Sequence, residues 1–193
     1  MASPAGTSRE TDAGRALLYS PSCYPEPACN TAIPYGIVRV GEGYGTVTEL
    51  LNATSVTKLI RNNPDDLSQA AKYYVDMLKN IHSIEVDDGE VPDMKETALS
   101  WADFVADHIP AEQGRKLRAL IEAVPKRNTL MHGDYHTNNI MVQNGEPLLI
   151  DMDTLCMGHP VFELGSMFNA FVGYSSSGSF HKPLILIYQR ADK

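Results

Sequence analysis

Residues 129–160 read TLMHGDYHTNNIMVQNGEPLLIDMDTLCMGHP, and this stretch carries most of the information in the chain. It contains two short apolar runs, 129–131 and 147–150, and acidic or amide side chains follow each run. Asn144-Gly145, which lies between the runs, is a strong signal for a two-residue β-hairpin. We therefore predict two strands whose polar ends face one pocket.

The polar residues have the spacing of a phosphoryl-transfer loop. His132, Asp134 and Asn139 match the pattern H-x-D-x-x-x-x-N, and Asp151 follows where a metal-binding aspartate would stand. A hydroxyl nucleophile needs a carboxylate within hydrogen-bond reach, which Asp134 would supply as the base. Mg²⁺ prefers hard oxygen ligands such as the Asn139 amide and the Asp151 carboxylate. The spacing thus predicts a base and two metal ligands close together.

The other polar side chains of this stretch have several interpretations. We assign His132 to the catalytic loop, where it braces the loop rather than transferring protons, because Asp134 already occupies the base position. His136 and Asn138 are not required by the pattern. Asp153 either supports the metal indirectly or caps the following turn. A zinc site could be formed by four of the side chains, although their spacing matches no zinc signature: His132, Asp134, His136 and Asp151.

Three segments of this region carry a family resemblance. HGDYHTNNIMV at 132–142, LLIDMD at 148–153 and GHPVFELG at 158–165 resemble the aminoglycoside phosphotransferase and choline kinase family, in particular bacterial phosphotransferases. MLKNIHSIEV at 77–86 resembles the family's helix that ends in Leu-His. AIPYGIVRVGEGYGTVTELL at 32–51 resembles its last N-lobe strands and hinge. This resemblance implies an α+β fold of the protein-kinase-like type.

The resemblance also divides the chain. Residues 31–52 correspond to the last hairpin of the N-terminal lobe and the hinge, and residues 53–174 to the helical C-terminal lobe with the catalytic and metal loops. Residues 1–30 do not match, and we expect a disordered tail there. Residues 175–193 do not match either, although they include the strand-like apolar run Pro183–Tyr188, which has no evident partner.

The function implied by the resemblance is transfer of the γ-phosphate of ATP, with Mg²⁺, to a hydroxyl group of a small molecule. Backbone groups at Glu49, Leu50 and Leu51 would contact adenine, and Asn139 would contribute to the nucleotide site through the metal. This chain has Glu163 where members of the resembled family usually have aspartate, which leaves the bracing role of this residue less secure.

Two other functions stay open. The family's phosphate-binding lysine has no counterpart before Lys58, so we expect a chain truncated at both ends relative to the family. A catalytically inactive remnant or binding module is therefore the alternative, and metal-dependent hydrolysis by His132, Asp134 and Asp151 is a third. The segment Gly41–Val47 resembles a kinase Gly-rich loop, but its third glycine is one position early. Ser55 and the following apolar spacing place Lys58 in a short helix rather than a strand.

Helices are predicted in four places. A helix from Pro64 to His82 has an apolar stripe: Leu67, Ala71, Tyr74, Leu78 and Ile81. His82 is expected to pack or cap rather than touch the site. A second helix carries Ala98, Ala102, Val105 and Ile109, with Trp101 and Phe104 packed inside the lobe. A third, opened by Pro110, buries Leu117, Leu120, Ile121 and Val124, and a fourth spans 161–171 under the active site.

Composition limits the classes of partner. The chain has 193 residues, 43% of them hydrophobic, and a formal net charge of −8. This length suits one domain or slightly more, and the acidic balance argues against a nucleic-acid partner. An acidic surface favours a cationic substrate in principle, but a solvated acidic face kept for solubility is the preferred interpretation. No apolar run approaches a membrane span or a signal peptide core, so we predict no membrane partner. The three cysteines form no paired framework, and we expect a cytoplasmic protein whose oligomeric state is open.

Overall fold

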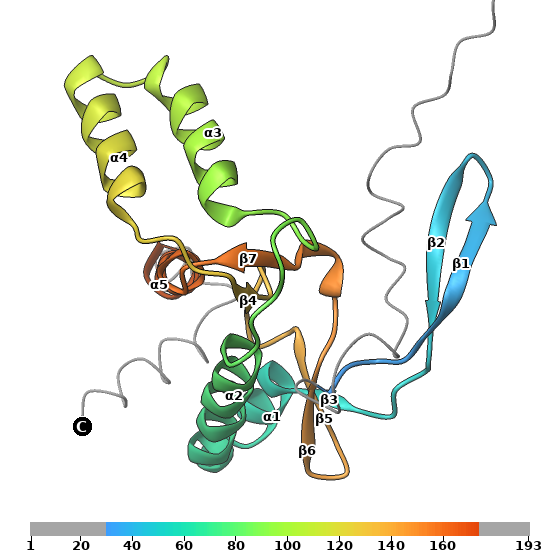
Figure 1. Ribbon diagram of the computed structural model, residues 1–193. Helices are drawn as coiled ribbons and strands as arrows, with labels where there is room; N and C mark the ends of the chain where they lie inside the picture. The colour runs from blue at the N-terminus through green and yellow to red at the C-terminus, as the bar shows by residue number, and fades with distance from the viewer. Residues whose placement is uncertain (1–29, 174–193) are drawn as a thin grey trace, which may run out of the picture.

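The computed structural model describes residues 30–173, and the expectations for residues 1–29 and 174–193 lie outside that range. Three small antiparallel sheets and five α-helices make up this part of the chain (Figure 1). The α+β class predicted from the sequence is confirmed.

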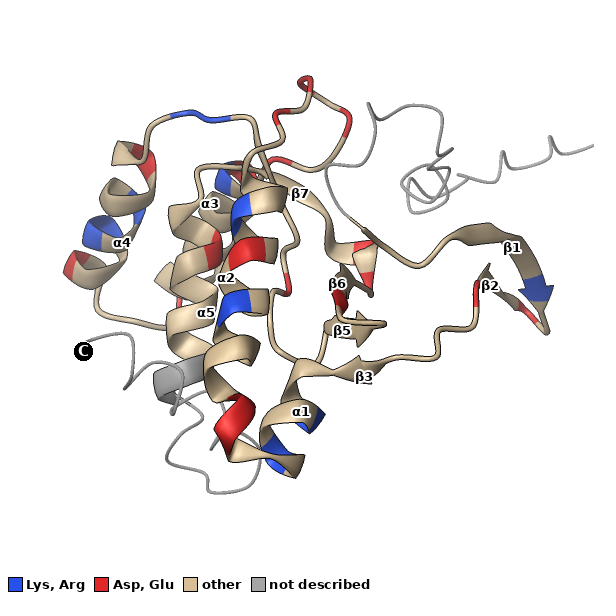
Figure 2. Ribbon diagram, turned by 90° about the horizontal axis from the view of Figure 1, so that it is seen from below, with Lys and Arg blue, Asp and Glu red and all other residues tan. Residues whose placement is uncertain are grey.

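The predicted N-terminal hairpin is present. Strand β1 spans Pro34–Val40 and pairs with β2, Gly43–Thr48, in antiparallel register. Gly41, with φ of 62°, lies in the turn between the strands. The hairpin projects away from the helices in both ribbon views (Figures 1 and 2). The segment Gly41–Val47, which resembles a kinase Gly-rich loop in sequence, therefore forms the turn and most of the second strand of this hairpin.

The second sheet has the order β3-β5-β6, with strands Thr54–Ser55, Ile140–Gln143 and Glu146–Leu149. Asn144 and Gly145 join β5 to β6 and both have positive φ, 54° and 84°. Two successive left-handed residues are the requirement of a type I′ turn, which Asn-Gly favours. The hairpin predicted from the sequence is thus confirmed, and it fixes where the polar residues on either side of it fall.

The third sheet was not predicted as such. Strand β4, Thr129–Met131, pairs with β7, Cys156–Gly158, and both strands are buried. Strand β7 directly follows residues 150–155, called the metal loop below because they include Asp151. Its pairing with β4 therefore brings the metal loop back beside the catalytic loop, residues 132–139. Asp93 and Glu85 form isolated bridges to the outer edges of this sheet.

Helices α1 and α2 pack beside the second sheet (Figure 1). Helix α1 spans Val56–Asn62, and Ser55 caps it by accepting a hydrogen bond from the Lys58 amide at 3.4 Å. Pro64–Asp66 forms a short 3-10 turn, so helix α2 begins at Leu67, three residues later than predicted, and ends at His82. The pyrrolidine ring and the Asn63 cap shape this first turn.

The buried stripe of α2 differs in part from the predicted one. Leu67, Tyr74 and Ile81 are buried as expected, but Ala70 and Met77 are buried in place of Ala71 and Leu78. The two replaced residues pack against the margin of the core. The buried face is therefore rotated slightly from the predicted one, toward the sheet.

Helices α3, Met94–Ala106, and α4, Ala111–Ala123, form a hairpin, and α5, Val161–Gly173, lies beneath them (Figure 1). Here the predicted packing is confirmed for Ala98 and Ala102, which are buried, but it is wrong for three larger side chains. Trp101 and Phe104 are 58% and 69% exposed, and Leu120 is 70% exposed. The apolar faces of these helices turn toward a cleft that no described residue fills.

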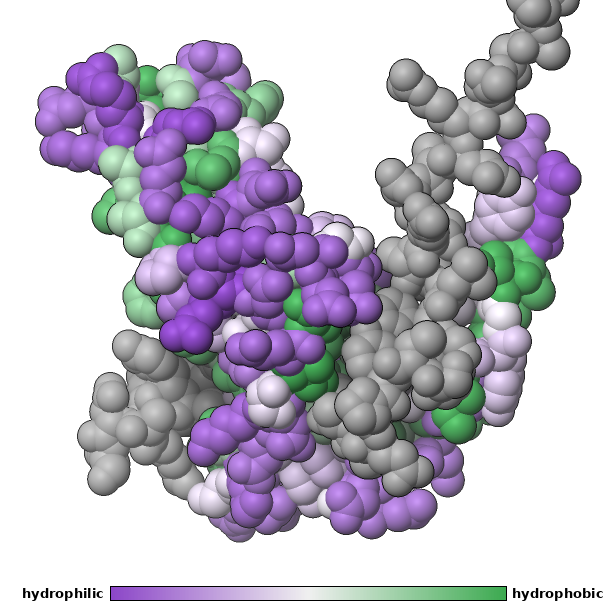
Figure 3. Space-filling view, viewed as in Figure 1, coloured by the Kyte–Doolittle hydropathy of each residue, from purple (hydrophilic) through white to green (hydrophobic). Residues whose placement is uncertain are grey.

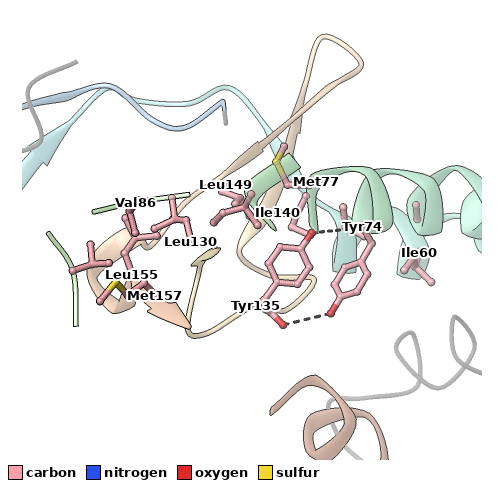
Figure 4. Close-up of a cluster of buried hydrophobic side chains, with 14 of the residues drawn as sticks. Ile60, Tyr74, Met77, Val86, Leu130, Tyr135, Ile140, Leu149, Leu155 and Met157 are labelled. Carbon is pink, nitrogen blue, oxygen red and sulfur yellow. Dashed lines mark hydrogen bonds between the residues drawn. The ribbon is translucent and has the colours of Figure 1, made fainter. Parts of the chain in front are cut away.

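The main core lies between α2, the catalytic loop and the sheets (Figure 4). The rings of Tyr74 and Tyr135 pack against each other in this core, tilted by 55°, with centroids 4.9 Å apart. None of the helices in the described range has both the length and the apolarity to cross a bilayer.

Candidate active site

The catalytic loop connects β4 to β5 and begins at His132, which is fully buried. Its Nε2 lies 2.9 Å from the carbonyl oxygen of Ile150, and its Nδ1 lies 3.3 Å from the amide nitrogen of Asp134. A carbonyl only accepts and an amide only donates, so the ring is the neutral tautomer with its proton on Nε2. With both nitrogens engaged, His132 holds the loop in place, which is the bracing role favoured by the sequence.

Asp134 and Asn139 come together at the two ends of this loop. The Asn139 amide nitrogen donates to the Asp134 carbonyl oxygen at 3.0 Å and reaches the Asp134 carboxylate at 3.5 Å. These acceptors fix the orientation of the amide, so its oxygen is the atom left for other partners. Asn139 is buried, and no other described residue donates a hydrogen bond to that oxygen. A buried amide oxygen without a donor is suited to a cation.

Asp151 lies at the end of the second apolar run in a left-handed conformation, with φ 64° and ψ 56°. A non-glycine residue in this region stores backbone strain of about 1–2 kcal/mol. The preceding residue donates its amide to the Asn139 carbonyl at 3.0 Å, which ties the metal loop to the catalytic loop. The chain thus holds Asp151 in an unfavourable conformation beside the predicted metal ligand.

The electrostatics of Asp151 also suit a cation. Partial desolvation, the charge and hydrogen bond of Asp153, and the charge of Asp134 raise the pKa of Asp151, while the nearby His132 lowers it. Like charges held together repel unless a cation lies among them. Asp153 is therefore close enough to raise the pKa of Asp151, and its role, in supporting the metal or in capping the turn, stays a prediction.

Gly133 locks the catalytic loop against the metal loop. Its φ is +84°, and a Cβ placed there would lie 2.2 Å from the carbonyl oxygen of Thr154. The Thr154 hydroxyl donates to the His132 carbonyl at 2.8 Å across the same contact. Only glycine satisfies both the backbone conformation and the close approach.

Glu163 of α5 braces the loop from behind. One of its carboxylate oxygens accepts the Gly133 amide at 2.8 Å, and the other lies 2.6 Å from His82 Nε2. The Glu163 side chain is 1% exposed. The glutamate thus fills the bracing role that the sequence left less secure, and His82 joins it as a packed partner at the end of α2.

Two further pairs of side chains hold the catalytic loop against α2 and α1, and neither pair is assigned this role by the sequence. The Tyr135 hydroxyl donates to the Tyr74 carbonyl, and the Tyr74 hydroxyl donates back to the Tyr135 carbonyl at 3.4 Å (Figure 4). The hydroxyls of Thr57 and Thr137 lie 2.7 Å apart and join α1 to the loop. Only the apolar spacing of α2 could have suggested Tyr74, and nothing in the sequence connects the threonines.

His136, which the predicted pattern does not require, lies beside Asp134, the predicted base. Its Nε2 lies 3.4 Å from the Asp134 carboxylate, and its Nδ1 lies 3.2 Å from the Asn138 amide nitrogen. The amide must donate, so Nε2 carries a proton toward Asp134. Within residues 30–173, no three His, Cys, Asp or Glu side chains are arranged to hold a metal ion, so the zinc alternative gains no support.

The predicted hinge residues connect the hairpin to β3. The Glu49 amide donates to the Ile33 carbonyl at 2.9 Å, which leaves that amide engaged. Leu50 is 99% exposed, and Leu51 is partly buried. Farther along, the Asn52 amide donates to the Gln143 side chain at 2.9 Å. The adenine contacts predicted for residues 49–51 remain a prediction.

The fold described above is that of the aminoglycoside phosphotransferases, which have a protein-kinase-like fold. The chain matches the phosphotransferase enzyme family, APH, over residues 26–191, and it belongs to that family. The matched range is wider than the range 31–174 over which the sequence resemblance was recognised. No curated protein sequence is detectably similar to this chain.

Solved structures show the same fold. A thermostable mutant of aminoglycoside phosphotransferase APH(4)-Ia without ligands superposes with a TM-score of 0.56 at 14% identity, covering 81% of this chain and 61% of that one. The N203A form of that mutant, solved with AMP-PNP and hygromycin B, gives 0.55 at 14% identity and covers 75% and 56%. The D198A form, solved with ADP and hygromycin B, gives 0.52 at 15% and covers 75% and 57%. The chain spans about three fifths of the length of these relatives.

Proposed function

We propose that this chain is an ATP- and Mg²⁺-dependent phosphotransferase that transfers the γ-phosphoryl group to a hydroxyl of a small molecule. The observation that carries the proposal is the joint placement of Asp134, Asn139 and Asp151. Asn139 is hydrogen-bonded to Asp134 through its side chain, and its carbonyl accepts the amide next to Asp151. In this proposal, the two loops on either side of the β5–β6 hairpin present one base and two oxygen ligands.

In this proposal Asp134 orients the acceptor hydroxyl and takes its proton. Its carboxylate is exposed, and His136 Nε2 lies 3.4 Å from it. The Asn139 oxygen and the Asp151 carboxylate would hold Mg²⁺, which would neutralise charge on the phosphate oxygens. His132 and Glu163 keep the loop backbone in place and do not contact the reacting atoms.

The acceptor is proposed to be a polyhydroxylated and cationic small molecule. The net charge of −8 and the cluster of Asp134, Asp151 and Asp153 favour a cation near the site. The solved relatives described above bind hygromycin B together with a nucleotide. Aminoglycosides, choline and small amino alcohols are therefore the first acceptors to test.

Metal binding tests the proposal without relying on turnover. Mn²⁺ replaces Mg²⁺ and is followed by electron paramagnetic resonance, with and without ADP. We expect binding that requires the nucleotide, because Mg²⁺ sites of this kind are completed by substrate phosphates. Asn139→Ala and Asp151→Asn should abolish it, whereas Asp134→Asn should change it only a few-fold.

Activity supplies the second test. Asp134→Asn should lower phosphate transfer by about 10²–10⁴ while circular dichroism shows an unchanged fold. Tight metal binding by the chain without nucleotide, or turnover that survives Asp134→Asn, would contradict the assignment.

A second candidate is a binding module of the same family with little or no turnover. In kinase-like enzymes a strand lysine and a Gly-rich loop hold the phosphates. Among residues 30–173 the six lysines lie on helices or in the loop before β4, and Lys58 lies in α1. We therefore expect turnover far below the usual kinase range of about 1–100 s⁻¹ in a coupled ATP-consumption assay. Turnover within that range would remove this second candidate.

A further inference from the structure

A cleft lies between the α3–α4 hairpin and α5, on the far side of the Glu163 brace. Its volume is about 450 Å³. Its walls are mainly apolar and include Met94, Trp101, Val105, Leu117, Ile121 and Phe162. Gly133 and Glu163 form its inner end, so the cleft reaches the back of the catalytic loop.

The apolar side chains that line this cleft are incompletely covered. Trp101 is 58% exposed, and Val105, Leu117, Ile121 and Phe162 are only partly buried. Hydrophobic side chains are visible on the α3–α4 hairpin in Figure 3. Full burial of one such side chain contributes about 1.5–3 kcal/mol, so a contiguous surface of this kind indicates a docking site.

We propose that the chain's own segment Pro183–Tyr188 docks in this cleft. The run Leu184-Ile185-Leu186-Ile187 is uncharged and aliphatic, and it has the chemistry of the cleft wall. It is also the apolar run to which the sequence assigned no partner. The proposal does not depend on the chain being an active phosphotransferase.

The connection is long enough. Helix α5 lines the cleft with Phe162 and Asn169, and nine residues, 174–182, separate its last residue, Gly173, from the segment. Nine residues can span about 30 Å when extended, whereas a helix of 13 residues is about 20 Å long. The segment can therefore reach every part of the cleft.

The attachment also favours this occupant over a second copy of the chain. A short linker gives an effective concentration in the millimolar range, well above micromolar protein in solution. At equal intrinsic affinity, the chain's own segment therefore occupies the cleft first.

Trp101 reports on the cleft directly, because it is the only tryptophan in the sequence. Acrylamide quenching of its fluorescence is compared between the wild-type chain and the double variant Leu184→Asp/Leu186→Asp. We expect a shielded tryptophan in the wild type, and in the variant a red-shifted emission and at least about a twofold faster quenching. The matched control Ser176→Asp/Ser179→Asp adds the same two charges within residues 174–182 and should behave as the wild type does.

Three outcomes would overturn the proposal. The first is equal quenching of Trp101 in the wild type and the double variant, and the second is a control variant that is quenched as fast as the double variant. The third is shielding of Trp101 that disappears when the protein is diluted to about 1 μM, which would indicate that a second copy of the chain fills the cleft. Hydrogen exchange on the wild-type chain gives a readout that needs no variant. Amides of residues 184–188 should exchange at least about tenfold slower than in the unfolded chain, and unprotected amides there would exclude docking.

Discussion

Replacing Gly133 by alanine should destabilise the protein through one identifiable clash. Alanine at φ of +84° costs about 1–2 kcal/mol of backbone strain. Its Cβ would also lie 2.2 Å from the Thr154 carbonyl oxygen, so the two loops must separate by about an ångström. Overpacking of this kind costs about 1–3 kcal/mol, and loss of the 2.8 Å bond from Thr154 to His132 adds about 1 kcal/mol.

Gly145 offers a matched control within the same chain. It has the same φ of +84°, but a Cβ there would meet no atom within 4 Å. Gly145→Ala therefore carries the strain alone, and Gly133→Ala should be less stable than this control by at least about 2 kcal/mol. For a domain of this size, that difference lowers the melting temperature by about 4–8 °C.

The assay is thermal and urea unfolding of both variants, followed by circular dichroism. Nucleotide-dependent Mn²⁺ binding should also weaken in Gly133→Ala and persist in Gly145→Ala, because only the first variant separates the loops. If the two variants unfold within about 1 °C of each other, the close contact between the loops does not exist in solution and the reasoning fails.

Three further predictions concern other parts of the molecule. Burial raises the pKa of the Cys156 thiol to about 12, so its alkylation at pH 8, followed by peptide mass spectrometry, should be at least about 10²-fold slower than in the unfolded chain. The pKa of this thiol is higher in the folded than in the unfolded chain, so its contribution to the free energy of unfolding should be lost as pH rises from about 9 to about 12. Cys156→Ser should remove that loss. The same pH dependence of stability in the wild type and in Cys156→Ser would contradict the prediction. Lys95 donates to the last carbonyls of α4 at 2.8 and 2.6 Å, so Lys95→Met should lower the free energy of unfolding by about 1 kcal/mol, whereas Lys116→Met on the exposed face should have no measurable effect. Val40 and Tyr44 are 66% and 79% exposed on a two-stranded sheet, so we expect self-association in sedimentation velocity that Val40→Lys/Tyr44→Lys reduces; an unchanged distribution would exclude the hairpin as its cause.

The catalytic hairpin was predictable because its signals are local. Asn144-Gly145 specifies a turn through the backbone conformations those residues allow, and the spacing from His132 to Asn139 fits one loop. The short helix at Lys58 was predictable from its cap for the same reason. Such features depend on residues a few positions apart, which the sequence displays directly.

The brace behind the loop could not be predicted, because its partners are far apart in the sequence. His82 and Glu163 are separated by 81 positions, and Tyr74 and Tyr135 by 61. Periodicity also misplaced the apolar side chains of α3 and α4, since it shows which face of a helix is apolar but not whether a partner covers it. Trp101 is the clearest example, because its aromatic side chain suggested a core position that the described fold leaves open.

The double contact made by Glu163 has a consequence for which side chain position 163 can accommodate. One carboxylate serves two donors, the Gly133 amide and the His82 imidazole, at 2.8 and 2.6 Å. Shortening it to aspartate would withdraw the carboxylate by about 1.5 Å, so α5 must move by a similar distance before both donors are served again. An aspartate at position 163 is therefore accommodated only together with a compensating shift of α5 toward the catalytic loop and α2.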